Sequence, residues 1–158
     1  MTYGKDVISI DAIINALYDV LCGPAGPRDW NRERFITHPG ARMMRGLPAD
    51  APAGEPPTPG LAIFSTEQFI EYATPRLLAE DFYEYETGRK VFRFGRLAHV
   101  ISAYGSTRSL DQAPFARGIN SVQLWFDGGR WWIMGVAWDW AGPENLVPAE
   151  LLEKPSKK

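Results

Sequence analysis

The sequence predicts an α+β fold in which helices gather on one face of an antiparallel sheet. Three observations carry this prediction. Apolar residues recur at helical spacing over residues 10–21, a helix-start signature begins at Ser65, and the later part of the chain alternates as strands do. Runs of helices followed by runs of strands, rather than regularly alternating units, are typical of this class.

The clearest strand pattern lies at residues 119–140, INSVQLWFDGGRWWIMGVAWDW. It predicts a hairpin whose tight turn is centred on the two glycines of DGGR, because glycine adopts positive φ at no steric cost. This turn sets Phe126 opposite Trp131 and Asn120 opposite Ala137. One face then carries Asn120, Val122, Leu124, Phe126, Trp131, Ile133, Gly135, Ala137 and Asp139. The other carries Ile119, Ser121, Gln123, Trp125, Trp132, Met134, Val136, Trp138 and Trp140. Both faces are largely apolar, so we expect both to be covered.

Length and composition are those of an ordinary globular chain. Its 158 residues are 45% hydrophobic and 23% charged, which suits one domain over residues 1–150 with a charged tail over residues 151–158. A formal net charge of -2 gives no electrostatic reason to expect nucleic acid or an anionic membrane as a partner. No apolar run is long enough to cross a membrane. The single cysteine, Cys22, excludes an internal disulfide, and the chain start lacks a signal-peptide pattern, so we expect a cytoplasmic protein.

Two helices open the chain. Ser9 can cap the first, over residues 10–21, and Asp29 can cap a short second helix over residues 30–35. The core-facing stripe of the first helix consists of Ile10, Ile13, Ile14, Leu17 and Leu21. A turn over residues 38–40 then leads into a short strand candidate over residues 41–45.

Residues 47–60, LPADAPAGEPPTPG, form a proline- and glycine-rich segment. Such a segment cannot supply regular ladder hydrogen bonds, so we expect an extended surface loop. Loops of this length in compact domains are often functional, and whether this one acts as a lid stays open. A brief strand is predicted directly after it, over residues 61–64.

The sharpest local signal follows at Ser65. Ser65 and Gln68 have the spacing of a capping box, in which each side chain bonds the other residue's backbone N–H. We expect this helix to run over residues 66–72 and to be interrupted at Pro75, which can begin a further turn as a first-turn proline.

Two more strands are predicted over residues 81–94 and 97–104. Alternation places Glu84 and Glu86 on one face of the first strand. One face of the second carries Ala98, Val100, Ser102 and Tyr104. A polar loop over residues 105–118 leads into the hairpin.

With this order of elements, the chain resembles the nuclear transport factor 2-like superfamily, which shares the cystatin-like fold. The resemblance rests on the long first helix, the segment FITHPGAR over residues 35–42, the helix opening STEQF and the terminal strand pair with DGGRWWI. More narrowly, it is similar to uncharacterised bacterial members that are often called SnoaL-like. It implies a cone-shaped curved antiparallel sheet wrapped around the N-terminal helices, with an apolar pocket inside the cone. Members include ketosteroid isomerase, scytalone dehydratase and polyketide cyclases as well as non-catalytic modules, and many form dimers through the outer sheet face.

The resemblance implies two candidate catalytic residues, Asp139 and His38. If the Asn120–Asp139 face points into the cone, burial of Asp139 beside tryptophans would raise its pKa and suit it to moving a proton. Alternatively, Asp139 sits at a strand end, paired or solvated. His38 titrates near neutrality and lies before the first strand, where it could act as a base or could only hold its turn by a backbone hydrogen bond.

The same orientation supplies the candidate ligand-binding residues. They are Tyr18, Ser102, Tyr104, Asn120 and Trp131. Tyr18 or Tyr104 could donate a hydrogen bond to a developing oxyanion, and Asn120 could orient a carbonyl group. Each could equally serve packing or satisfy a backbone group. We read Glu84 and Glu86 as surface partners of the arginines that follow them.

Two hypotheses therefore follow from the sequence. The first is a homodimeric cone-fold protein that binds a small, mostly apolar molecule and catalyses isomerisation, cyclisation or dehydration by acid–base chemistry. The second is a non-catalytic homodimeric binding or assembly module. In both, Gln123, Trp125, Trp132 and Trp138 are interface candidates on the outer sheet face. No clustered metal ligands, phosphate loop or dinucleotide fingerprint is present, so we expect no metal and no cofactor.

Overall fold

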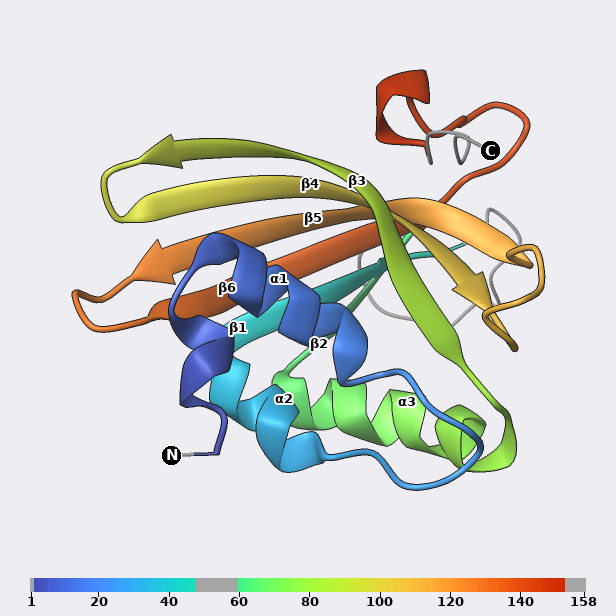
Figure 1. The fold of residues 1–158 in the computed structure, drawn as a ribbon, viewed down its shortest axis with the longest axis horizontal. Helices are drawn as coiled ribbons and strands as arrows, with labels where there is room; N and C mark the ends of the chain where they lie inside the picture. The colour runs from blue at the N-terminus through green and yellow to red at the C-terminus, as the bar shows by residue number, and fades with distance from the viewer. Residues whose placement is uncertain (1, 48–59, 153–158) are drawn as a thin grey trace.

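In the described part of the chain, three α-helices pack on one side of a curved six-stranded sheet (Figure 1). The computed structural model describes residues 2–47 and 60–152. The helices are α1 (Ile10–Asp19), α2 (Trp30–Ile36) and α3 (Thr66–Ala79), with short 3-10 helices η1 (Gly4–Val7) and η2 (Ala149–Leu151). The strands are β1 (Thr37–Gly46), β2 (Leu61–Phe64), β3 (Tyr83–Phe94), β4 (Leu97–Thr107), β5 (Ala116–Phe126) and β6 (Trp131–Trp140). The predicted α+β class with a curved sheet is confirmed.

The predicted helix starts are confirmed by their caps. The Ser9 hydroxyl accepts a hydrogen bond from the Ala12 N–H at 3.0 Å, and Asp29 caps α2 in the same way. At α3, the Ser65 hydroxyl accepts from the Gln68 N–H at 3.2 Å while the Gln68 side chain accepts from the Ser65 N–H at 2.9 Å. These bonds satisfy backbone donors that have no partner within the helix, which fixes where each helix begins.

The predicted interruption of the third helix at Pro75 is wrong. Helix α3 continues to Ala79 with Pro75 inside it. Proline removes one backbone donor from the helix ladder, but Ile70 before it and Leu77 after it are both buried. The Thr74 hydroxyl also donates to the Ile70 carbonyl at 2.6 Å. Tertiary packing of one helix face therefore outweighs the local cost of the proline.

The sheet has the strand order β2-β1-β6-β5-β4-β3. Neighbouring strands are antiparallel except β1 and β6, which run parallel, so the sheet is mixed where a purely antiparallel one was predicted. The two parallel strands come from opposite ends of the chain, and no local turn signal could indicate their pairing. The turn predicted over residues 38–40 lies inside β1, where the register with β6 shifts.

The hairpin of β5 and β6 forms as predicted near its turn but not beyond it. Phe126 pairs with Trp131, but only Gly128 of the two turn glycines has a positive φ, 109°. The register then shifts by one residue, because Met134 is an extra residue in β6. Asn120 consequently lies opposite Trp138, and the predicted pairing of Asn120 with Ala137 is wrong. A bulge of this kind reverses which side chains face the core from that point on.

The reversal decides which end of β6 reaches the interior. Trp131 and Ile133, before the bulge, are buried in the core as predicted. After it, the inward-facing residues are Val136, Trp138 and Trp140, which line the cavity described below. Asp139 is exposed, and Trp138 does not belong to the outer face where it was predicted to form an interface.

Contacts are described at Leu47 and Gly60, the first and last residues of the predicted loop, and at Leu151, which begins the predicted tail. Leu47 donates its N–H to the Gly60 carbonyl at 2.9 Å, and residues 48–59 of the predicted loop lie outside the described residues. Leu151 is buried, and its carbonyl accepts a hydrogen bond from the Thr87 hydroxyl on β3. The division into a domain over residues 1–150 and a tail over residues 151–158 stays a prediction, with residues 153–158 outside the described part.

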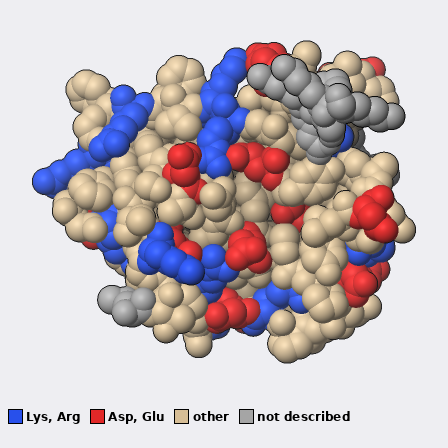
Figure 2. Space-filling view, in the orientation of Figure 1, with Lys and Arg blue, Asp and Glu red and all other residues tan. Residues whose placement is uncertain are grey.

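Charges of both signs are mixed over the face drawn in Figure 2, with no large area of one sign. Among the residues that the structure describes, no helix is long and apolar enough to cross a membrane.

Candidate functional site

A mostly apolar cavity of about 200 Å³ lies between the helices and the inner face of the sheet. This volume exceeds the ~150 Å³ of an engineered cavity that takes benzene, so it has room for one ring with substituents. Its walls come from α1, α2, α3 and five strands. The lining residues are Leu17, Leu21, Glu33, Met43, Phe69, Tyr72, Ala73, Arg76, Leu77, Phe82, Glu84, Tyr104, Ser106, Phe115, Ala116, Asn120, Val136, Trp138 and Trp140.

One side of the cavity carries polar groups from three neighbouring strands. Glu84 on β3 pairs in register with Ser106 on β4, and the Ser106 hydroxyl donates to the Glu84 carboxylate at 3.4 Å. Tyr104 on β4 and Asn120 on β5 complete the group. Burial raises the pKa of Glu84 to about 7, although the Ser106 and Asn120 side chains and the charge of Arg76 act in the opposite direction. Glu84 borders the cavity, and with this pKa its carboxyl group is present in both protonation states near neutral pH.

A buried hydrogen-bond chain holds this polar side in place. The Asn120 amide donates to the Tyr18 hydroxyl at 3.1 Å, and Tyr18 is bonded to the Ser102 hydroxyl at 2.7 Å. Ser102 in turn donates to the carboxylate of Glu86, whose other oxygen accepts from Arg89 at 2.7 Å. Burial raises the pKa of Tyr18 well above its ordinary value, so its hydroxyl stays protonated. This series of hydrogen bonds fixes the orientation of the Asn120 side chain, which still lines the cavity.

Tyr104 reaches the cavity because its neighbouring strand carries a glycine. A Cβ atom at Gly118 would lie 2.5 Å from the Tyr104 hydroxyl and 2.7 Å from its Cζ atom. Burial raises the pKa of Tyr104 far above its ordinary value, and the nearby Glu84 charge adds to this effect. The phenol is therefore a neutral hydrogen-bond donor at any physiological pH.

A second carboxyl group, Glu33 on α2, borders the cavity away from β3. Its side chain is 1% exposed, and neither of its carboxylate oxygens has a hydrogen-bond partner among the described residues. Burial raises the pKa of Glu33 to about 7. The hydroxyl of Thr37, one helical turn further, lies close enough to oppose that rise, but not in the geometry of a hydrogen bond.

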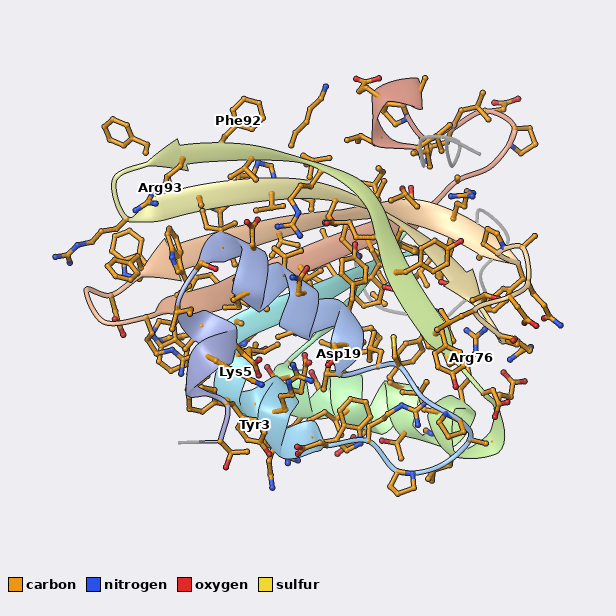
Figure 3. All side chains as sticks on the ribbon, in the orientation of Figure 1. Tyr3, Lys5, Asp19, Arg76, Phe92 and Arg93 are labelled. Carbon is orange, nitrogen blue, oxygen red and sulfur yellow. The ribbon has the colours of Figure 1, made fainter. Side chains whose placement is uncertain are left out.

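Aromatic and cationic side chains stand at the α3 end of the cavity. Arg76, labelled in Figure 3 beside β3, lies over the rings of Phe82 and Phe115 at 5.4 and 5.6 Å from their centroids. Arg45 donates to the Tyr72 hydroxyl at 2.9 Å and lies over the Trp140 ring. These contacts place two guanidinium groups beside the walls of an otherwise apolar cavity.

No protein-family model matches the chain, and no curated protein matches its sequence. Solved structures do match its fold. An NTF2-like protein of unknown function from Silicibacter pomeroyi DSS-3 aligns with a TM-score of 0.57 at 16% identity, covering 84% of this chain and 92% of that one. A putative dehydratase of the NTF2-like family from Streptomyces avermitilis aligns at 0.60 and 12% identity, covering 87% and 96%. The chain has the nuclear transport factor 2-like fold. A putative ketosteroid isomerase from Parabacteroides distasonis ATCC 8503 aligns at 0.56 and 14% identity, covering 87% and 92%.

Within this nuclear transport factor 2-like fold, four predicted site residues come together. Tyr18, Ser102 and Asn120 are directly connected by hydrogen bonds, and Tyr104 lines the cavity beside Asn120. Trp131 is buried in the core but is not part of the cavity wall.

The two predicted catalytic residues lie elsewhere. Asp139 is exposed and accepts a hydrogen bond from the Trp140 N–H, because the Met134 bulge turns it away from the cavity. His38 accepts from the Gly40 N–H at 3.0 Å and packs its ring edge-on to Trp132, outside the cavity wall. Both positions match the structural alternatives that the sequence left open.

The cavity's two carboxyl groups were missed as site residues. The reading of Glu84 and Glu86 as surface partners holds only for the contact between Glu86 and Arg89, since Glu84 borders the cavity. The available signal was their spacing, because two residues that are two positions apart on a strand share a face, and that face could have been the inner one. Glu33 gave no signal, since a single acidic residue in a short helix is usually exposed. Among the described residues, no group of three His, Cys, Asp or Glu side chains could hold a metal ion.

Proposed function

We propose that the chain binds a small, mostly apolar molecule in this cavity and moves a proton on it. The observation that carries the proposal is Glu84, a carboxyl group with a pKa of about 7 on the wall of an apolar cavity. A group with such a pKa can both accept and return a proton at neutral pH, as isomerisation, cyclisation and dehydration require.

The neighbouring residues have complementary roles in this proposal. Tyr104 donates a hydrogen bond to an oxygen of the ligand, where negative charge develops as Glu84 takes a proton from an adjacent carbon. Asn120 donates one amide N–H to Tyr18, and its side chain also acts on Glu84 and lowers the pKa of that carboxyl group, so Asn120 holds the base beside the ligand. The chain from Tyr18 through Ser102 to Glu86 holds Asn120 in place.

The test is hydrogen–deuterium exchange at the carbon next to the carbonyl of cyclic ketone probes, followed by proton NMR in deuterated buffer. Glu84→Gln keeps the shape of the side chain and removes the base, so we expect the catalysed exchange rate to fall by about 10²- to 10⁴-fold. Asp139→Asn is the matched variant, with the same chemical change on an exposed side chain, and should exchange as fast as the natural protein.

Two outcomes would count against this assignment. Exchange that persists in Glu84→Gln would remove Glu84 as the base. Exchange that is lost only in Asp139→Asn would return the role to Asp139, which the sequence suggested first.

A second candidate function is that of a homodimeric binding or assembly module. The observation that favours it is an apolar row across four strands of the outer sheet face. In register order the row is Phe94, Leu97, Trp125 and Trp132. Phe94 is 85% exposed and Trp125 is 42% exposed, which is unusual for side chains of this size. A second copy of the chain would cover such a row.

The oligomeric state tests this candidate. We expect light scattering coupled to size exclusion to give a dimer, and Trp125→Asp to give a monomer, because a charge would be buried without a partner at the interface. Leu110→Asp is the control, since Leu110 is also exposed but lies in the loop between β4 and β5. A monomeric natural protein would contradict the dimer whatever the exchange assay finds.

A further inference from the structure

Glu33 is a buried acceptor group without a partner. Neither of its carboxylate oxygens accepts a hydrogen bond from any described residue, and the Thr37 hydroxyl beside it is also unpartnered and only 2% exposed. Buried polar groups almost always have partners, and leaving a charged one without any is costly. Ion pairs within the described chain do not involve Glu33 either.

The place of Glu33 shows where its partner would have to be. The side chain borders the cavity from α2, whereas the polar group of Glu84, Tyr104 and Asn120 borders it from the sheet. Leu17 and Met43 contribute apolar wall and offer no strong hydrogen-bond donor. Among the described residues the Thr37 hydroxyl acts on Glu33 but no cation pairs with it, so a cationic partner would have to come from what enters the cavity.

We propose that the ligand is a small apolar primary amine whose ammonium group binds Glu33. Both Glu33 oxygens are unpartnered acceptors on the cavity wall, and the Thr37 hydroxyl lies next to them without lining the cavity. An ammonium group has three N–H donors and a positive charge, so it can bond both oxygens at once, whereas an alcohol has one donor and no charge. A carboxylate placed next to Glu33 would meet repulsion from it, since the lining cation, Arg76, lies over the rings of Phe82 and Phe115 and forms no ion pair with Glu33. The inference rests on the proposed function only in taking the cavity as the ligand site, and it requires no turnover.

The amine places the rest of the ligand toward the sheet. With its ammonium group at Glu33, the body of the molecule fills the apolar middle of the cavity, and its reacting carbon lies toward Glu84. Charge recognition and proton transfer are then separate tasks of two carboxyl groups, each on its own element. A hydrogen bond to a charged partner is worth roughly tenfold to a hundredfold in affinity, which sets the size of the expected preference.

The experiment compares benzylamine, benzyl alcohol and benzoate, three probes of one ring and different polar groups. Binding is measured by calorimetry and by NMR shifts at pH 8, where Glu33, with its pKa of about 7, is mostly ionised. We expect benzylamine to bind about 10- to 100-fold more tightly than benzyl alcohol. We expect no measurable binding of benzoate.

Three variants locate the preference. Glu33→Gln should bind the amine and the alcohol about equally, while Glu67→Gln, the same change at an exposed acid that does not line the cavity, should keep the preference. Thr37→Val removes the hydroxyl that opposes the rise in the pKa of Glu33, so a smaller fraction of Glu33 is ionised at pH 8. This variant should weaken the binding of the amine a few-fold and leave the binding of the alcohol unchanged. Circular dichroism melts confirm that each variant is folded, and Thr37→Val keeps the test decisive if Glu33→Gln does not fold.

Each contrary outcome has a distinct meaning. An alcohol that binds as tightly as the amine, or a benzoate that binds more tightly, would overturn the ligand class. A preference that survives Glu33→Gln but not Glu84→Gln would move the ammonium site to Glu84 and overturn the inference. Because binding is read without turnover, a preference that depends on Glu33 stands even if Glu84→Gln leaves deuterium exchange unchanged and the proposed catalysis fails.

Discussion

Replacing Glu33 by glutamine is expected to stabilise the protein at pH 8 and to leave its stability nearly unchanged near pH 4.5. In the folded chain, burial raises the pKa of Glu33 from about 4.5 to about 7. Folding therefore favours the protonated form. The contribution of Glu33 is fully present below the pKa of the unfolded chain and is lost as pH rises through about 7. The full difference corresponds to about 3 kcal/mol, and glutamine, which never ionises, avoids this loss.

The measurement is urea unfolding of both proteins at intervals from pH 4.5 to pH 8. The free energy of unfolding of the natural protein should fall over this range, and the Glu33→Gln variant should show a shallower fall. Some fall should remain in the variant, because burial raises the pKa of Glu84 in the same direction. In the difference between the two free energies of unfolding at each pH, the contributions of all titratable groups that both proteins share cancel.

The control for this prediction is Glu67→Gln. Glu67 is exposed, and its hydrogen bonds with Arg34 lower its pKa, so its contribution is present above the pKa of the unfolded chain. The contribution of Glu67 to stability is lost only under more acidic conditions. Between pH 5 and pH 8, the free energy of unfolding of the variant should therefore change with pH as that of the natural protein does. Parallel curves for Glu33→Gln and the natural protein would mean that Glu33 finds a partner or water in solution.

Most of the fold prediction rests on interactions between residues that are close in the sequence. The caps at Ser9, Asp29 and Ser65 are interactions within one turn of chain, so residue type and spacing suffice to predict them. The glycine pair after Asp127 likewise predicts a hairpin from four residues. Prediction failed at Pro75, where the helix is held by packing of Ile70 and Leu77 against other elements.

The candidate site was predicted in part, and one residue explains much of the difference. Tyr18, Ser102 and Asn120 come together in one hydrogen-bonded group, because each lies on an element whose period is unbroken, but only Asn120 of the three lines the cavity. Met134 breaks the period of β6, and its insertion leaves no mark in the alternation of apolar residues around it. Counting through the bulge therefore assigned Asp139 to the interior in place of Trp138.

Buried acids are the other class that sequence patterns miss. Glu33 and Glu84 are charged residue types, and charged residues are nearly always exposed unless a site requires otherwise. Their burial depends on how α2 and β3 meet the remaining elements. Only the three-dimensional arrangement brings both to one cavity, and with it the chemistry proposed for this fold.

Gly118→Ala is expected to destabilise the protein by about 1–3 kcal/mol and to displace Tyr104 from the cavity wall. A Cβ atom there would overlap the Asp139 carbonyl oxygen of the neighbouring strand and lie 2.5 Å from the Tyr104 hydroxyl. One contact is backbone and cannot swing away, and the other is a ring held by the surrounding core. Overpacking of this kind forces backbone shifts at about that cost.

Gly142→Ala is the matched control, because a Cβ atom at that position would have no atom within 4 Å. Urea unfolding should show a clear loss for Gly118→Ala and a change of less than about 0.5 kcal/mol for Gly142→Ala. The ring resonances of Tyr104 should move only in the first variant. If Gly118→Ala is as stable as its control, β5 and β6 can separate without cost, and the close approach at Gly118 is not what sets Tyr104 beside Asn120. If it is destabilised and also loses probe binding, the glycine both closes the sheet and shapes the site.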